Sequence, residues 1–84
     1  MLEEQGQRVT VEAMAESAHD AWMAAYLALG YQSRKAAWGE EFMVPFADLS
    51  EQGKEFDRII MRAILTALDR QGFAVVRKEG ILPA

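Results

Sequence analysis

The chain has 84 residues, of which 51% are hydrophobic and 26% charged, so its composition is that of one small folded domain and excludes an intrinsically disordered chain. Its net charge of −4 argues against nucleic acid and anionic membranes as partners, because both repel an acidic protein. The absence of cysteine excludes disulfides and thiolate metal sites.

Targeting and membrane signals are also missing from the sequence. The first residues are acidic and lack the apolar run of a signal peptide, and no later segment approaches the roughly 20 apolar residues of a membrane span. We therefore expect a cytoplasmic protein that does not associate with a membrane.

The first helix is predicted from about Val11 to Leu29. Thr10 can cap its N-terminus, and Gly30 suits the left-handed conformation that ends many helices. Apolar residues recur on one face with the period of a half-buried helix. They are Val11, Met14, Ala15, Ala18, Trp22, Ala25 and Leu29. Because Trp22 lies at the centre of this face, we expect it in the core.

A loop leads from this helix to a joint in which an extended segment, a proline and a helix start follow one another. Pro45 fixes its own φ and favours an extended Val44, while Ser50 can accept a hydrogen bond from the first turn of the next helix. The second helix is therefore predicted from about Glu51 to Arg70, and Gly72 closes it.

The second helix carries more apolar surface than one partner helix can cover. We expect its buried face to contain Phe56, Ile59, Ile60, Ala63, Ile64, Ala67 and Leu68. Met61 and Leu65 extend the apolar arc beyond that face. A second packing surface is therefore expected, and it favours a homodimer.

The segment 73–76 is rich in β-prone residues but too short for a stable strand without a neighbour. We interpret it as an edge strand or extended arm, with Phe42 to Phe46 as its possible partner. The expected fold is mostly α (α+β), with two principal helices joined by a long loop in which Gln32 to Gly39 looks flexible. Its folded part is predicted at 10–77, between an N-terminal lead (1–9) and a C-terminal tail (78–84).

Short motifs spread over 11–76 resemble the RyR domain, a small module that repeats in ryanodine receptors. The matching elements are His19 with Trp22, Gly30 with Tyr31, Val44-Pro45-Phe46, Leu49-Ser50-Glu51, Lys54, and Gly72 with Phe73. The chain departs from the family pattern at Tyr31, where tryptophan is usual, and at Gln32-Ser33-Arg34.

The resemblance implies a mostly helical unit without catalytic residues. The receptors carry such units as pairs related by an approximate twofold axis, so a single copy implies a homodimer. Single RyR domains are similar to modules of bacterial and phage proteins, which implies a role in sensing or sequestering a small ligand, nucleotide-like ligands among them.

The central loop is the place where aromatic and basic residues interleave outside a helix. Tyr31 and Trp38 flank the Arg34-Lys35 pair, and aromatic rings can stack on a planar base while cations meet its phosphates. The alternative for Trp38 is simple packing against the second helix.

The second helix carries a basic stripe formed by Lys54, Arg58 and Arg62. Arg58 and Arg62 are candidate phosphate partners, because a guanidinium can hold phosphate in bidentate fashion. The alternative, which we favour, is ion pairing with Glu51 and Glu55 on the same helix.

His19 is the only histidine. Its imidazole could bond a ligand, but the favoured interpretation is that it satisfies a backbone carbonyl beneath the Val44-Pro45 joint.

No glycine-rich phosphate loop, no nucleophile with a base partner and no paired carboxylates placed for acid–base work occur in the sequence. We therefore expect no enzyme activity, no cofactor and no metal. The leading hypothesis is a module that binds a nucleotide-like or other anionic metabolite. The alternative is a protein-interaction or structural module without a small ligand, in which the surface of Met61 and Leu65 docks another protein.

Overall fold

The computed structural model describes residues 10–76, and the predicted lead and tail lie outside this range. The elements are helix α2 (Val11–Ala28), the short 3-10 helix η1 (Phe46–Asp48) and helix α3 (Glu51–Arg70). Within 10–76 there is no strand, and the β component is a single bridge between Lys35 and Glu41. The mostly α class is thus confirmed.

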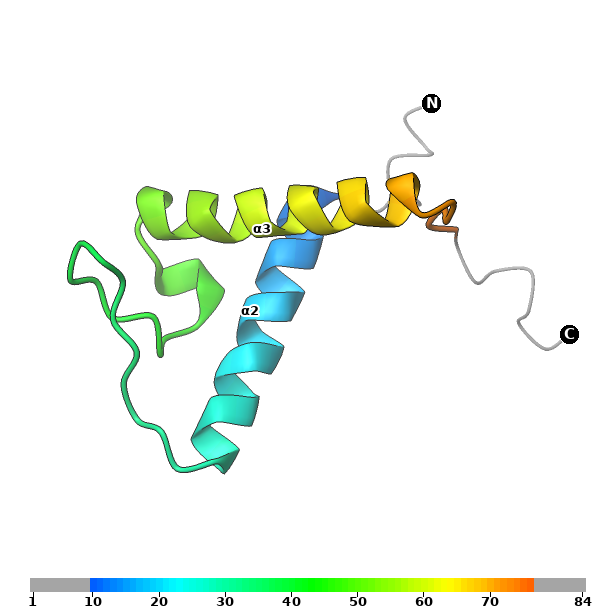
Figure 1. The fold of residues 1–84 in the computed structure, drawn as a ribbon. Coiled ribbons are helices and arrows are strands. Elements are labelled where there is room, and N and C mark those ends of the chain that lie inside the picture. Colours follow the sequence, from blue (N-terminus) through cyan, green and yellow to red (C-terminus); the bar gives the residue numbers. More distant parts are fainter. Residues whose placement is uncertain (1–9, 77–84) are drawn as a thin grey trace, which may run out of the picture.

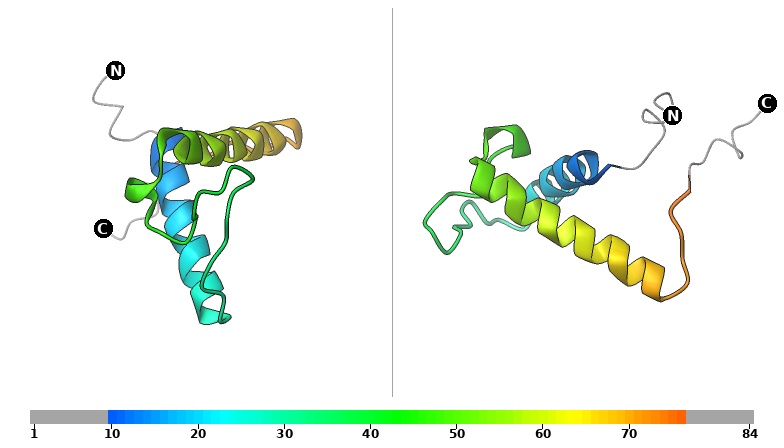
Figure 2. Two further views of the ribbon diagram at one scale, coloured as in Figure 1. Left: turned by 90° about the vertical axis from the view of Figure 1, so that its left-hand side faces the viewer. Right: turned by 90° about the horizontal axis from the view of Figure 1, so that it is seen from above.

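The two helices cross, and the connecting segment runs from the far end of α2 back to the start of α3 (Figure 1). The N-terminal part of α2 lies against the middle of α3. The C-terminal half of α3 therefore projects beyond the crossing, as the further views also show (Figure 2). The chain is accordingly elongated, with principal extents of 44 × 28 × 26 Å.

Local capping explains where α2 begins and ends. The Thr10 hydroxyl accepts a hydrogen bond from the Ala13 N–H at 3.0 Å, which satisfies one of the free donors of the first turn. At the other end Gly30 adopts a φ of 96°, a conformation that costs glycine little. The predicted cap and bounds are confirmed to within one residue.

The start of α3 is capped twice. The Ser50 hydroxyl accepts from the Gly53 N–H at 3.0 Å, and the Glu40 carboxylate in turn accepts from the Ser50 hydroxyl at 2.6 Å and from its N–H at 2.8 Å. Gly53 leaves room for this carboxylate, because a Cβ there would lie 3.0 Å from both Glu40 oxygens. The predicted bounds of α3 are confirmed.

The core is small and lies beneath the joint. Its buried apolar residues are Ala15, Phe46, Leu49 and Met61, with Val11, Met14, Phe42 and Val44 packed against them. The joint contributes Phe46 and Leu49, so the proline-centred turn forms the middle of the core and not merely a connection.

The prediction that Trp22 lies in the core is wrong. Its side chain is only half-buried, and the buried positions of α2 are Ala15 and His19. The reason is the crossing of the helices: α3 covers the N-terminal part of α2, whereas Trp22 lies further along α2, where the loop forms the opposite wall.

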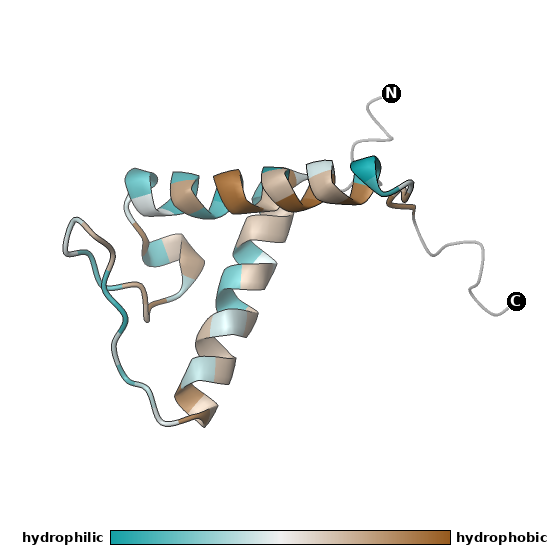
Figure 3. Cartoon of the chain, viewed as in Figure 1, coloured by the Kyte–Doolittle hydropathy of each residue, from teal (hydrophilic) through white to brown (hydrophobic). Residues whose placement is uncertain are grey.

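The predicted buried face of α3 is also wrong. Met61 is buried and Leu65 is half-buried, whereas Ile59, Ile60 and Ile64 are 55%, 39% and 43% exposed. α2 therefore contacts the Met61 side of the broad apolar arc. Hydrophobic residues continue along α3 beyond the crossing, where the described part of the chain leaves them uncovered (Figure 3).

The predicted strand pairing of 73–76 with Phe42 to Phe46 is absent. The segment 73–76 follows the far end of α3, away from the joint, and Val76 is 78% exposed. Because 73–76 and the joint lie at opposite ends of α3, no ladder can form between them.

The core assignment predicts unequal effects of two aromatic truncations. Phe46→Ala should cost about 3 to 5 kcal/mol and abolish cooperative unfolding, because it leaves a cavity at the centre of a small core. Trp22→Ala should cost about 1 to 3 kcal/mol and keep a cooperative melt, because Trp22 is half-buried. Thermal melts followed by circular dichroism measure both, and equal losses would contradict this assignment.

The double cap of α3 predicts that Ser50→Ala costs more than Thr10→Ala. Loss of a single cap bond, as in Thr10→Ala, should lower the free energy of unfolding by about 1 kcal/mol, whereas Ser50→Ala should lower it by about 2 kcal/mol, because it also removes a bond to Glu40. Urea titrations of the two variants provide the comparison. A Thr10 variant as costly as the Ser50 variant would show that Glu40 adds nothing to the cap.

Candidate functional site

A cavity of about 470 Å³ lies between the two helices and the connecting loop. Both helices and the loop contribute walls. The cavity therefore exists only because the loop returns from the end of α2 to the start of α3 and lies beside both helices. Its lining consists of Ala15, Ala18, His19, Trp22 and Tyr26 from α2, Arg34 to Trp38 and Phe42 from the loop, and Phe56, Asp57, Ile60 and Met61 from α3. Four of the seven candidate ligand-binding residues are in this set: His19, Arg34, Lys35 and Trp38.

His19 connects the three segments that surround the cavity. Its Nε2 lies 2.8 Å from the Val44 carbonyl oxygen and its Nδ1 lies 2.9 Å from Oδ2 of Asp57 on α3. A carbonyl can only accept, so Nε2 carries a proton and donates it to Val44. The favoured interpretation, that His19 satisfies a backbone carbonyl of the joint, is confirmed.

The contact between His19 and Asp57 must also contain a proton. With Nε2 protonated, a neutral imidazole would present a lone pair at Nδ1 to the carboxylate, which is repulsive at this distance. Burial raises the pKa of the Asp57 carboxyl, and the neighbouring His19 partly opposes this shift. One proton therefore lies between Nδ1 and Oδ2, and both ring nitrogens of His19 are occupied by the protein.

Aromatic rings form two groups in the cavity wall. On α2 the centroids of Trp22 and Tyr26 are 4.7 Å apart. On the other side Trp38 contacts Phe42 and Phe56, with centroid distances of 5.8 and 6.2 Å. The packing of Trp38 against the second helix is thus confirmed, and Trp38 still remains 41% exposed.

Tyr31, a fifth candidate, lies next to the cavity but not in its lining. Its ring contacts that of Tyr26 at a centroid distance of 5.2 Å, and the residue is 56% exposed. Tyr31 therefore covers the outer side of a wall residue.

The loop segment that carries Arg34, Lys35 and Trp38 folds into a hairpin-like turn. The Ala36 N–H donates to the Glu40 carbonyl and the Gly39 N–H donates to the Ala36 carbonyl, both at 2.8 Å. Gly39 takes a φ of 92°, which few other residues tolerate. The turn places Trp38 over α3 and turns the basic pair toward the cavity.

Two neighbouring carboxylates hold this turn in place. Glu41 accepts hydrogen bonds from the Ser33 hydroxyl and from the N–H groups of Arg34 and Met43, and these three donors lower the pKa of Glu41 to about 2. Glu40 accepts from the Trp38 indole N–H at 2.8 Å in addition to capping α3. Both carboxylates thus act as anchors for the backbone and the tryptophan.

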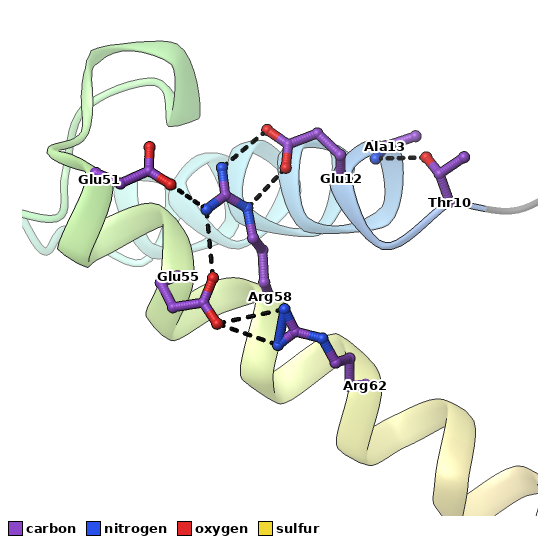
Figure 4. A network of polar contacts seen from close by, with 7 residues as sticks. All are labelled: Thr10, Glu12, Ala13, Glu51, Glu55, Arg58 and Arg62. Carbon is purple, nitrogen blue, oxygen red and sulfur yellow. Dashed lines mark hydrogen bonds and ion pairs between the residues drawn. The ribbon is translucent and has the colours of Figure 1, made fainter.

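The remaining candidates, Arg58 and Arg62, are not among the residues that line the cavity. They belong to a network of ion pairs between α3 and the start of α2 (Figure 4). Arg58 bonds Glu12 of α2 at 2.7 Å and also reaches Glu51 and Glu55, and Arg62 bonds Glu55 at 3.2 Å. These carboxylates raise the pKa of Arg58. The interpretation that Glu51 and Glu55 neutralise the basic stripe is confirmed for these two arginines.

The cations of the cavity differ from Arg58 and Arg62. Among residues 10–76, neither the Arg34 guanidinium nor the Lys35 ammonium forms an ion pair within 4.0 Å of a carboxylate. Both residues are exposed at the edge of the cavity. They are therefore the positive charges available to an anion that enters there.

Sequence reasoning missed four acidic residues that build the site: Asp20, Glu40, Glu41 and Asp57. Asp20 accepts from the Phe46 N–H at 3.0 Å and so fixes the joint on α2. Asp57 had a visible signal, because a carboxylate in the middle of the apolar arc of α3 needs a buried partner. The others bond backbone N–H groups of the loop, the joint and the start of α3, up to 26 residues away in sequence, and no periodic pattern marks such residues.

No family model, curated protein or solved structure matches this chain. Neither of the two described helices is long and apolar enough to cross a membrane.

The bonds of Glu41 predict a specific contribution to acid sensitivity. Since its folded pKa is lowered from 4.5 to about 2, the stability it contributes is present above pH 4.5 and is lost as the pH falls toward 2. Glu41→Gln should therefore be less stable than the parent at neutral pH and should lose less on acidification. Thermal melts across this range provide the test.

Glu16→Gln is the matched control, because Glu16 is exposed and bonds no other side chain in 10–76. It should leave the pH profile unchanged. The anchoring role of Glu41 is refuted if its variant and the control follow the parent profile equally.

Proposed function

We propose that this chain is a non-enzymatic module that binds a small planar anion, such as a nucleotide-like metabolite, in the cavity between α2, α3 and the loop. The observation that carries the proposal is the position of Arg34 and Lys35, two cations without carboxylate partners in the described part of the chain, at the edge of an aromatic-walled cavity.

The size and chemistry of the cavity suit such a ligand. Its volume of about 470 Å³ falls in the range of roughly 300 to 1,000 Å³ that small-molecule sites occupy. Trp22, Tyr26 and Trp38 offer ring faces or edges to a planar group, while Arg34 and Lys35 can meet phosphate or carboxylate oxygens. A ligand with a planar ring and an anionic tail uses both features at once.

His19 supports the site without contributing a free hydrogen-bonding group. Because both ring nitrogens bond the protein, His19 orients Asp57 and the joint and closes the wall. The same arrangement favours a binding protein over an enzyme, since the only histidine is engaged as a structural connection. Arg58 and Arg62 play no part in the proposed site.

The resemblance to the RyR domain supports the proposal. Several of the residues that carry it are neighbours in the fold: His19 contacts Trp22, the Val44 carbonyl and the Phe46 ring, with centroid distances of 5.4 Å to Trp22 and 6.1 Å to Phe46. The shared motif is thus one packing unit beside the cavity. We propose that the chain is a single RyR-like module of the ligand-binding kind.

The test is calorimetry and thermal shift with a panel of adenine and guanine nucleotides, including cyclic ones, with the unphosphorylated nucleosides and inorganic phosphate as comparison. We expect at least one nucleotide to bind more tightly than either comparison. Arg34→Ala or Lys35→Ala should weaken that binding by about 1.5 to 3 kcal/mol, roughly a factor of 10 to 150. Added salt should weaken it too.

Arg62→Ala is the matched control, because it removes one positive charge from the surface away from the cavity. It should leave the affinity within a factor of about 2 of the parent. A panel without any heat or stabilisation would reject the proposal, and an equal loss in the control would show that net charge alone attracts the anion.

A further inference from the structure

Asp57, one of the residues that line the cavity, has one carboxylate oxygen that the fold does not use. Its Oδ2 lies 2.9 Å from Nδ1 of His19, whereas its Oδ1 forms no hydrogen bond or ion pair within 10–76. The side chain is 17% exposed, and the described chain contains no buried side-chain oxygen or nitrogen without a partner. Oδ1 is therefore open to a group that approaches from outside.

The proton shared with His19 decides what Oδ1 can bond. That proton lies between Nδ1 and Oδ2, so Oδ1 carries no hydrogen at either position of the proton along this contact. Oδ1 is then an acceptor only, and it carries part of a negative charge whenever the proton is on the imidazole. A polar group that meets Oδ1 must donate a hydrogen bond.

A ligand that fills the cavity removes Oδ1 from water. If the ligand donates an N–H, a hydrogen bond to a charged acceptor replaces the lost hydration. If the ligand presents only a C–H or a lone pair there, the oxygen is left without a partner, which costs free energy. Sites that hold such a polar group discriminate strongly against analogues that lack the matching donor.

Two other polar groups of the lining also have no hydrogen bond within 10–76, the Tyr26 hydroxyl and the Trp22 indole N–H. The hydroxyl can donate or accept, and the indole N–H can donate to any ring nitrogen, carbonyl or phosphate oxygen. Neither group separates one ring edge from another. Asp57 is the only carboxylate of the lining, so it is the side chain that selects for a donor.

Opposite charges come from different walls of the cavity. Arg34 and Lys35 belong to the loop and Asp57 to α3, and neither cation lies within 4.0 Å of the Asp57 carboxylate. The arrangement suits a ligand with an anionic group at one end and an N–H donor at the other. A nucleotide has both, whereas an aromatic acid without an N–H has only the first.

This inference rests on the proposed function and narrows its ligand. We infer that the planar ring of the bound anion carries an N–H donor, as adenine and guanine do, and that Asp57 is the specificity-determining residue that accepts the hydrogen bond. His19 acts through Asp57, because its bond to Oδ2 holds the carboxylate in place and leaves Oδ1 toward the ligand.

The first test changes the ligand and leaves the protein intact. Calorimetry compares GMP and AMP with purine riboside monophosphate, which has the same purine, ribose and phosphate but no N–H or amino group on its ring. We expect the tighter of GMP and AMP to exceed the donor-free nucleotide in affinity by at least about tenfold.

Equal affinities for the three nucleotides overturn the inference but leave the proposed function intact, because an anion with a planar ring still binds. Binding of none of the three overturns the inference as well, and the wider panel of anions then decides whether the proposed function survives.

The second test replaces the charged acceptor with a neutral one. Asp57→Asn keeps the size of the side chain, and its amide can donate to Nδ1 of His19 once the shared proton is gone. A neutral amide oxygen then stands in place of Oδ1. Since hydrogen bonds to neutral acceptors are about half as strong, the preference over the donor-free nucleotide should fall from about tenfold to about threefold.

Asp69→Asn is the matched control, because it removes the same charge from an exposed position of α3 that does not line the cavity. It should keep the full preference. Binding of the donor-free nucleotide to Asp57→Asn shows that this variant still forms the cavity. A preference equally large in both variants refutes the role of Asp57.

A third measurement needs no substitution. In an isotopically labelled parent, the carboxyl carbon signal of Asp57 should shift on addition of GMP or AMP and should stay in place with purine riboside monophosphate. A signal that moves equally with all three nucleotides contradicts the inference, even if Asp57→Asn fails to fold.

Discussion

The buried imidazole of His19 is the interaction on which the rest of the fold depends. It is 5% exposed, and its two ring nitrogens connect α2 to the joint through Val44 and to α3 through Asp57. These bonds join positions 25 and 38 residues apart in sequence. With four buried apolar residues in the described chain, hydrophobic packing alone leaves the helix crossing weakly defined, whereas directional bonds in a low-dielectric environment select one arrangement.

Carboxylates determine where the loop lies, and the position of the loop determines the charge at the edge of the cavity. Glu41 and Glu40 accept hydrogen bonds from backbone N–H groups, hydroxyls and the Trp38 indole, so two negative charges of an acidic protein are engaged by neutral donors of the turn and of the start of α3. The same turn presents Arg34 and Lys35 at the cavity edge without carboxylate partners in 10–76. An overall charge of −4 is therefore compatible with a locally positive entrance.

The features that could be predicted from the sequence are those that local chemistry decides. Thr10 and Ser50 mark the helix starts because capping involves the next three residues, and Arg34, Lys35 and Trp38 were recognisable because they are close in sequence. The choice between Ile60 and Met61 as the buried side of α3 depends on where α2 crosses, which is a long-range property. For the same reason Glu12, 46 residues away, could not be foreseen as a partner of Arg58.

The cavity extends along α3 to Ile60, which lines it and is still 39% exposed. A ligand in the cavity would therefore cover apolar surface at Ile60 and Phe56, which the described part of the chain leaves exposed. In a chain whose described core is small, a ligand that binds only the folded state would stabilise it by mass action, so binding of the proposed ligand and folding would share one equilibrium.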